Sequence, residues 1–378
     1  PFTAFQSVNK KTVLNRLNFN WREIDLPEHI RTKYTHRLHP YLGKFIPQIA
    51  EIFLRKYALK TVCDPFMGSG TTLVEASVLG FNSIGVDVSA FNCLLAQVKT
   101  GIYDADKLEA EASVILEKYR QNLDGKFSLN GQYANASDYL RTWFHPISLK
   151  ELLLFLNLIQ GTAYESVYKI VLSRAARSAR LVPHHELDFP DTPAIVPYQC
   201  RKHFRECYPT IGAAKFVNRY LLDTIRRIRE YSTIRKNAEV KIKHGDAREI
   251  RLPFFDTVVT SPPYVGLIDY HEQHRYAYEL LGLKRSDNLE IGPADKGTSA
   301  DAKTKYRDGI VRVFQKCAAS MPKGGKAVIV VRDRHGIYDN LAPSCGFRAG
   351  ERFERHVNRR TGRRNSELFE SIFIWSRA

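Results

Sequence analysis

The sequence predicts an α/β fold with a mostly parallel sheet, interrupted by a helical insertion. Residues 62–76, VCDPFMGSGTTLVEA, predict an apolar strand, a tight Gly-rich turn and the first turns of a helix. Strand-like runs return after residue 237, whereas residues 101–236 carry apolar side chains mainly at helical spacing. We therefore expect residues 1–100 and 237–378 to form two halves of one domain around an insertion.

The first half contains a predicted βαβ unit. Pro47 suits the start of a helix that continues through residues 49–59, where apolar side chains recur at helical spacing. The run KTVCDPF predicts the first strand, and the helix that follows it is expected to end at Gly80. The run FNSIGVDVS predicts a second strand that ends near an acid, Asp87.

The insertion and the second half continue this pattern. Helices of the insertion are expected at 151–160, 166–181 and 213–231, with a Pro-rich loop at 182–197. Further strands are expected within 238–249, 255–264 and 321–333, and a basic hairpin within 353–375.

The composition limits the function classes. The 378 residues are 44% hydrophobic but contain no apolar run of about 18 residues, so no membrane span is expected. The formal net charge of +17 favours a polyanionic partner, nucleic acid first and an acidic membrane surface second. The six cysteines are scattered and form no C-x-x-C pair, which is typical of a protein of the reducing cytoplasm.

A metal site is not expected. Cys200, His203 and Cys207 form the nearest approach to a ligand cluster, but their spacing is loose and the sequence offers no obvious fourth ligand. Ordinary packing of these side chains is the simpler interpretation.

The Gly-rich turn matches neither of two common nucleotide motifs. No Lys follows Gly70, which excludes a P-loop, and the third Gly of a dinucleotide site is absent. Two glycines nevertheless allow a ligand to approach the backbone closely. Asp87 lies 19 positions after Gly68, within the usual reach of a carboxylate that binds both hydroxyls of a ribose.

A second motif, TSPPY at residues 260–264, follows the apolar run FDTVV. Together with DPFMGSGTT at 64–72, it resembles the amino-group DNA methyltransferases, which methylate exocyclic nitrogens of bases with S-adenosylmethionine. The resemblance covers residues 30–100 and 238–335 well and the insertion weakly. It implies a Rossmann-like methyltransferase domain with a mostly parallel seven-stranded sheet, a cofactor half at 1–100 and a catalytic half at 237–378.

The resemblance also implies site residues. HPYLGKFIPQ is similar to the segment that closes over the methionine end of the cofactor, and HGDAR to the loop whose acid faces the adenine amino group. The implied cofactor-binding residues are Lys44, Phe45, Asp64, Pro65, Phe66, Gly68, Ser69, Gly70, Thr71, Thr72, Asp87 and Asp246. The implied catalytic residues are Ser261, Pro262, Pro263 and Tyr264.

The chemistry explains why the catalytic motif has these residue types. An exocyclic amine is a poor nucleophile because its lone pair is delocalised into the ring. The Ser261 hydroxyl and the Pro262 carbonyl can accept its two hydrogens, and Pro263 contributes no N–H that competes for that carbonyl. Tyr264 offers a face for stacking of a base extruded from the duplex. No cysteine follows a proline, so the Pro-Cys nucleophile of cytosine C5 methylation is absent.

The serine form of the motif favours the N4 amine of cytosine, and the context favours a restriction–modification system. Adenine N6 is the main alternative, and an RNA or protein-glutamine methyltransferase is a more distant one. The expected partners are double-stranded DNA and a cognate restriction endonuclease.

Basic residues gather in two helices of the insertion and in the C-terminal hairpin, and residues 101–236 are the candidate target-recognition domain. The predicted DNA-binding residues are Arg174, Arg177, Arg180, Arg226, Arg227, Arg359, Arg360, Arg363 and Arg364.

Overall fold

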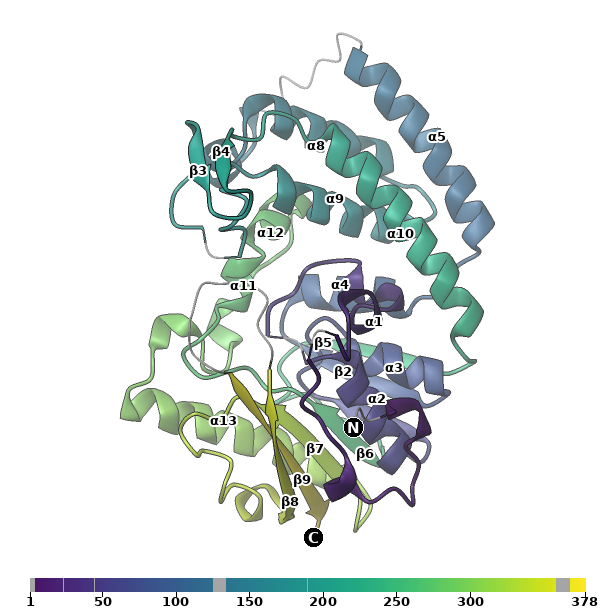
Figure 1. The fold of residues 1–378 in the computed structure, drawn as a ribbon, viewed down its shortest axis with the longest axis vertical. Helices are drawn as coiled ribbons and strands as arrows, with labels where there is room; N and C mark the ends of the chain where they lie inside the picture. The colour runs from purple at the N-terminus through teal and green to yellow at the C-terminus, as the bar shows by residue number, and fades with distance from the viewer. Residues whose placement is uncertain (1–3, 23, 44, 125–133, 189, 358–367) are drawn as a thin grey trace.

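The computed structural model describes residues 4–22, 24–43, 45–124, 134–188, 190–357 and 368–378 (Figure 1). Within these residues seven strands form one sheet in the order β5-β2-β1-β6-β7-β9-β8. The first five of these run parallel, whereas β9 is antiparallel to both β7 and β8. The predicted mostly parallel α/β sheet is thus confirmed. The strands are β1 Thr61–Asp64, β2 Asn82–Asp87, β5 Val240–His244, β6 Thr257–Thr260, β7 Lys326–Val331, β8 Phe347–His356 and β9 Phe369–Arg377.

Both faces of the sheet are buried, so the central strands β1 and β6 carry apolar side chains on both faces. Val62 of β1 and Val259 of β6 pack on one face, against helix α2. Their neighbours Cys63 and Val258 point to the opposite face, where helix α13 covers them. The flanking helices are α2 Pro47–Tyr57, α3 Thr71–Leu79, α4 Ala90–Thr100 and α13 Ala300–Ala319.

The helix ends of the first half follow the local sequence signals. Pro47 occupies the first turn of α2, where its missing N–H costs no hydrogen bond. Gly80 ends α3 with a left-handed φ of 87°, as predicted, and its N–H is donated to the carbonyl of Ala76. The Ser89 hydroxyl caps α4 by accepting from the N–H of Asn92 at 3.1 Å.

The insertion is mainly helical, as predicted, and Figure 1 shows its long helices stacked at one end of the sheet domain. They bury their apolar faces in a single cluster that also contains Phe91 and Leu95 of α4 and Tyr276 and Leu280 of helix α12, Arg275–Leu281. The insertion therefore shares one core with both halves of the sheet domain. Its elements are α5 Ala105–Asp124, α7 Asp138–Trp143, α8 Pro146–Ile159, α9 Glu165–Ala179, β3 Tyr198–Cys200, β4 Arg205–Cys207 and α10 Ala214–Ile234.

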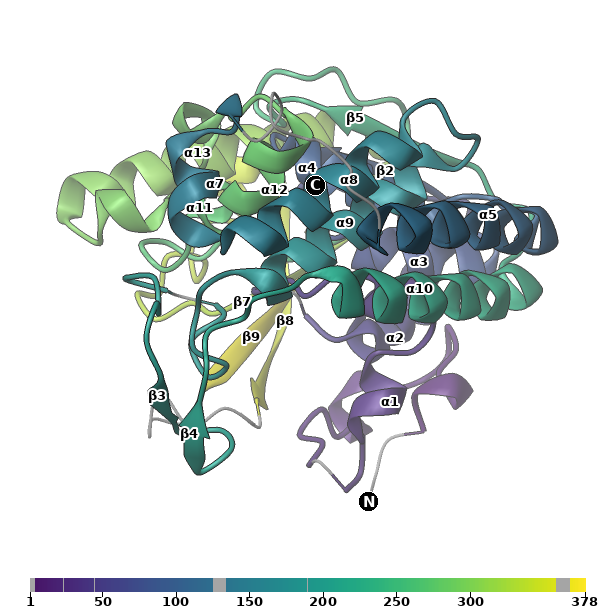
Figure 2. The same ribbon diagram turned by 90° about the horizontal axis from the view of Figure 1, so that it is seen from above.

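The C-terminal hairpin is confirmed as β8 and β9, which pair from Phe347↔Arg377 to His356↔Phe369. Arg359, Arg360, Arg363 and Arg364 lie outside the described residues. Figure 2 shows the β3–β4 hairpin, the ends of β8 and β9 and the N-terminal segment extending to the same side.

The remaining short helices complete the described fold. No helix of the described residues combines the length and the apolar character that a bilayer span requires. The short helices are η1 Phe5–Ser7, η2 Leu14–Arg16, α1 Glu28–Arg31, η3 Tyr34–Arg37, α11 Tyr270–Gln273, α12 Arg275–Leu281, η4 Asp287–Leu289, η5 Ala294–Lys296 and η6 Pro343–Cys345.

Candidate active site

A pocket of about 830 Å³, including its open mouth, lies at the carboxyl ends of β5, β2, β1 and β6. Parallel strands of an open sheet present their carboxyl ends at one edge, where ligands of such folds bind. Both halves of the chain contribute to the lining. The predicted site residues that line it are Phe45, Pro65, Phe66, Gly68, Ser69, Thr71, Asp87, Asp246, Ser261 and Pro263. Lys44 lies outside the described residues.

The Gly-rich turn is tight because neighbouring groups leave no room for side chains. Gly68 has a φ of 49°, and a Cβ built on it would lie 3.1 Å from the Tyr41 hydroxyl. Gly70 has a φ of 75° and faces Ala96 of α4 rather than the pocket. Gly68 thus permits the close approach of Tyr41, whereas Gly70 permits the packing of the turn on α4. The close approach of a ligand to the Gly68 backbone stays a prediction.

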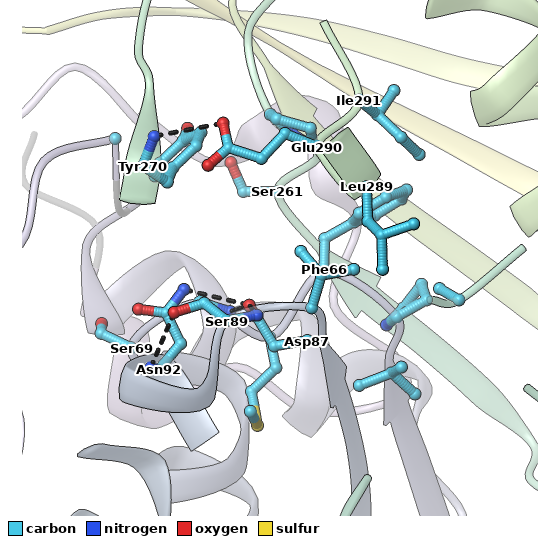
Figure 3. Close-up of a pocket in the computed structure, with 18 of the residues that line it drawn as sticks. Phe66, Ser69, Asp87, Ser89, Asn92, Ser261, Tyr270, Leu289, Glu290 and Ile291 are labelled. Atoms are coloured by element: carbon cyan, nitrogen blue, oxygen red, sulfur yellow. Dashed lines mark hydrogen bonds between the residues drawn. The ribbon is translucent and has the colours of Figure 1, made fainter. Parts of the chain in front are cut away.

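Asp87 ends β2 and joins the turn to α4 (Figure 3). Its Oδ2 accepts from the Gly68 N–H at 2.8 Å, and its Oδ1 accepts from the Ser89 N–H at 2.8 Å and the Asn92 amide at 3.1 Å. Burial raises the pKa of Asp87, although these hydrogen bonds oppose the rise. Two carboxylate oxygens offer about four acceptor sites, so one site on Oδ2 is available to a ligand hydroxyl.

Asp64 connects the cofactor turn to the catalytic motif. Its Oδ1 accepts from the Thr260 hydroxyl at 2.6 Å and from the Phe66 N–H at 3.2 Å. The Thr72 hydroxyl donates to the carbonyl of Val259 at 3.0 Å. Neither Asp64 nor Thr72 lines the pocket, so we assign them the role of holding the end of β1 and the start of α3 against β6.

The catalytic motif follows directly from the end of β6. The Ser261 hydroxyl oxygen is buried and has no partner of normal hydrogen-bond geometry among the described residues. The Pro263 carbonyl accepts from the Tyr306 hydroxyl at 2.8 Å, whereas no described donor reaches the carbonyl of Pro262. The two acceptors that the chemistry requires are thus adjacent in sequence, and no described residue donates to either with normal geometry. Ser261 lines the pocket, whereas Pro262 does not, so the contact of its carbonyl with a base stays a prediction.

Tyr264 is positioned differently from Ser261. Its side chain is buried in the core cluster beside α13 and does not line the pocket. Its hydroxyl donates to Oε1 of Glu370 at 3.3 Å, and Arg355 holds the other oxygen of that carboxylate at 2.9 Å. The stacking role of Tyr264 stays a prediction, since it requires the ring to face an extruded base.

Residues after the catalytic motif that were not predicted from the sequence also line the pocket, among them Tyr270, His271 and Glu290. Glu290 accepts from the backbone N–H groups of Tyr270 and His271 at 3.2 and 2.8 Å, and it also contacts the His271 imidazole (Figure 3). The Tyr270 ring stacks on Tyr41 with centroids 6.1 Å apart. These residues belong to no recognised motif. The sequence indicates them only through the many Tyr and His residues in DYHEQHRYAY, residues 269–278.

The expectation that the arginines of the insertion form a DNA-facing surface is wrong for three of them. Arg174 is buried, pairs with Asp223 at 2.7 Å and covers the Tyr220 ring. Arg180 is buried and donates to the Leu187 carbonyl. Arg227 is buried and donates to Asp223 and to backbone carbonyls of the segment before α2. These guanidinium groups are used internally because acceptors from distant segments fold against them.

The other two arginines differ in their exposure. Arg177 pairs with Asp188, and its side chain is 14% exposed. The side chain of Arg226 is 72% exposed although it pairs with Asp223 at 2.7 Å, so it remains available to an additional anion.

A second group of polar side chains lies outside the pocket. The expectation that Cys200, His203 and Cys207 lack a fourth neighbour is wrong. His184, from the Pro-rich loop, brings a ring nitrogen close to their ligand atoms, and the four atoms lie within 4.8 Å of one another.

Comparison with known proteins decides the family. A profile of the DNA methylase family of N6- and N4-methyltransferases matches residues 52–98, which contain the Gly-rich turn. The type II methyltransferase M.MjaII of Methanocaldococcus jannaschii is 35% identical over 430 residues, covering 92% of this chain and 81% of that protein. The chain belongs to the amino-group DNA methyltransferases. This methyltransferase uses S-adenosylmethionine as its methyl donor, and its substrate is DNA.

More distant proteins match the methyltransferase over smaller shares of their length. The type II methyltransferase M.MvaI of Kocuria varians is 26% identical over 305 residues, which is 75% of this chain and 63% of that protein. Among solved structures, TrmN from Thermus thermophilus aligns with a TM-score of 0.35 and 11% identity, over 89% of this chain and 50% of that chain.

Proposed function

We propose that this methyltransferase transfers the methyl group of S-adenosylmethionine to the exocyclic N4 of a cytosine extruded from duplex DNA. The observation that carries the proposal is the pair of acceptors at the end of β6. The Ser261 hydroxyl is buried and has no partner of normal hydrogen-bond geometry among the described residues, and no described donor reaches the adjacent Pro262 carbonyl. An unpaired buried polar group costs free energy, which a substrate donor recovers on binding.

The two acceptors match the two hydrogens of an exocyclic amine. When both hydrogens are held, the nitrogen lone pair is withdrawn from conjugation with the ring and directed at the incoming methyl group. S-adenosylmethionine, when bound, would supply the methyl group: the N–C bond would form as the C–S bond breaks, S-adenosylhomocysteine would leave with the electron pair of that bond, and one amine hydrogen would pass to solvent as a proton. Positioning contributes much of the rate of such a direct transfer.

The pocket offers matching surfaces for the methyl donor. Phe66, Leu289 and Ile291 form an apolar wall suited to the adenine ring (Figure 3). The available acceptor site of Asp87 suits one ribose hydroxyl, fewer than the two expected from the sequence. Asp246 also lines the pocket, but Arg248 already holds its carboxylate at 2.7 Å, so its contact with the adenine amine stays a prediction.

Two considerations favour cytosine and a restriction–modification system. The serine form of the catalytic motif is the form that the family resemblance associates with cytosine N4. The curated relatives M.MjaII and M.MvaI are both described as type II methyltransferases, which supports the role of a modification enzyme with a partner endonuclease.

Product analysis tests the base. Unmethylated duplex DNA is incubated with isotope-labelled S-adenosylmethionine and the enzyme, then digested to nucleosides for mass spectrometry. We expect labelled N4-methyldeoxycytidine, and none with the Ser261→Ala variant. Labelled N6-methyldeoxyadenosine would show that the target base is adenine and not cytosine. Label found only in added RNA or in glutamine side chains would show that DNA is not the substrate.

The DNA is proposed to lie across the face to which the β3–β4 hairpin and the ends of β8 and β9 extend (Figure 2). Arg201, Lys202 and Arg205 are exposed on the β3–β4 hairpin. Each neutralised phosphate adds about 0.9 to the slope of log K against log salt concentration. Replacement of Arg359, Arg360, Arg363 and Arg364 by Gln should reduce that slope and leave cofactor affinity unchanged. An unaltered slope would remove this stretch from the DNA interface.

A further inference from the structure

The side chains of His184, Cys200, His203 and Cys207 converge where the Pro-rich loop meets the β3–β4 hairpin. Three of them lie within eight residues of sequence, but His184 precedes Cys200 by sixteen positions and joins only through the fold. None of the four lines the cofactor pocket. The cluster is therefore separate from the methyl-transfer site.

The spacing of the donor atoms matches that of a tetrahedral zinc site. The His203 Nδ1 lies 3.6 Å from the Cys200 Sγ and 3.4 Å from the Cys207 Sγ. A tetrahedral zinc with ligands at about 2.3 Å for sulfur and about 2.0 Å for nitrogen places such a pair about 3.5 Å apart. The His184 ring completes the set, since its centroid lies 4.9 Å from that of His203.

The ligands are also oriented by the local backbone. Cys200 ends β3 and Cys207 ends β4, and both side chains are buried although the hairpin is short. Between them, Phe204 takes a left-handed φ of 53° and donates its N–H to the Cys200 carbonyl at 2.8 Å. The turn therefore returns His203 toward the two thiols while Phe204 itself is 92% exposed.

Apart from the cluster, the described contacts of the hairpin with the Pro-rich loop are made by Tyr198, whose hydroxyl accepts from the His184 N–H at 3.2 Å and whose ring contacts those of His184 and His185. The two strands of the hairpin contain three residues each, and no residue from Tyr198 to Cys207 belongs to a buried apolar cluster. An isolated two-stranded hairpin is marginal in water, and small elements without a core are commonly held by a metal or a disulfide.

We propose that His184, Cys200, His203 and Cys207 bind one structural Zn²⁺ ion. Two thiolates and two imidazoles are the ligand set that zinc prefers, and four protein ligands leave no open position for a substrate. The ion would fasten the Pro-rich loop to the hairpin, which displays Arg201, Lys202 and Arg205 to solvent. Zinc would thus stabilise a basic surface element and take no part in the methyl transfer.

Metal analysis of the full chain tests the site. The protein is purified under reducing conditions, given one equivalent of zinc, and dialysed against zinc-free buffer. We expect about one zinc per chain in the wild type and less than a fifth of that in Cys207→Ser and His184→Gln. The matched controls are His185→Gln, next to His184 but outside the cluster, and Cys345→Ala, a buried cysteine elsewhere; both should retain the zinc.

Measurements on the wild type keep the proposal testable if a variant does not fold. X-ray absorption at the zinc edge should show two sulfur ligands at about 2.3 Å and two nitrogen ligands at about 2.0 Å. Removal of the metal by a chelator should lower the melting temperature of the protein. The affinity of the metal-free protein for the cofactor should be unchanged. Wild-type protein without zinc, a Cys200–Cys207 disulfide in reduced preparations, or an oxygen-rich coordination shell would each overturn the site.

Discussion

Replacement of Asp64 by Asn tests whether this carboxylate holds β1 against β6 or binds the cofactor. The Asp64 side chain is 1% exposed, and burial raises its pKa from an ordinary 3.8 to about 6. A carboxyl group whose pKa is higher in the folded chain than in the unfolded chain is destabilising once it ionises. The free energy by which ionised Asp64 destabilises the fold is small below about pH 4, grows between about pH 4 and 6, and is nearly constant above that.

The structure sets the magnitude. The difference between 3.8 and about 6 corresponds to about 3 kcal/mol of destabilisation above pH 7, at 1.36 kcal/mol for each factor of ten. Between pH 4.5 and 8 the change is about 2 kcal/mol. The amide of Asn cannot ionise, and its oxygen can still accept from the Thr260 hydroxyl and the Phe66 N–H. Its NH₂ group would face the Thr72 hydroxyl, which already interacts with Asp64.

Urea unfolding of the cofactor-free protein, followed by tryptophan fluorescence at pH 4.5 and pH 8, measures the effect. We expect the stability of Asp64→Asn relative to wild type to rise by about 2 kcal/mol between the two pH values. Asp138→Asn, at a 97% exposed side chain, serves as the control and should show no such rise. An identical pH dependence in Asp64→Asn and wild type would refute a buried ionised carboxylate.

The cofactor affinity of the same variant separates the two roles of Asp64. A positioning role predicts a dissociation constant for S-adenosylmethionine within about threefold of wild type. A loss of tenfold or more in calorimetry would place Asp64 in the cofactor site.

Three further predictions concern the pocket and its support. Asp87→Ala should weaken S-adenosylmethionine binding at least tenfold, about 1.4 kcal/mol, in calorimetry, because a hydrogen-bond acceptor is lost; unchanged affinity would exclude Asp87 from the site. Ser261→Ala should lower the turnover number with little change in cofactor affinity, and full activity would disprove its role as an acceptor. Arg355→Ala should destabilise the fold by about 3 kcal/mol in urea unfolding, since the buried Glu370 charge loses its cationic partner and keeps only the Tyr264 hydroxyl as a donor. The half-exposed Arg352→Ala should cost less than about 1 kcal/mol, and equal losses for the two variants would contradict the reasoning.

The local signals of the cofactor turn and the catalytic motif were sufficient to predict several of the residues that line the candidate pocket. Gly68 could be recognised because a left-handed turn between a strand and a helix excludes most side chains. Asp87 and Ser261 could be predicted to lie at one edge because Asp87 ends one strand and Ser261 follows another, and parallel strands end at the same edge of the sheet. For such residues, the position along the chain relative to a strand implies the position in space.

Other parts of the site depend on contacts between distant segments, which no local pattern reveals. Glu290 reaches the pocket only because it accepts from the N–H groups of Tyr270 and His271, about twenty positions earlier. The sequence does not reveal whether a charged side chain is exposed to solvent or pairs with a partner inside the protein. Arg174 is buried because Asp223, 49 positions away, pairs with it. Cys200, His203 and Cys207 of the β3–β4 hairpin acquire a fourth possible ligand only when the Pro-rich loop folds back and brings His184 beside them.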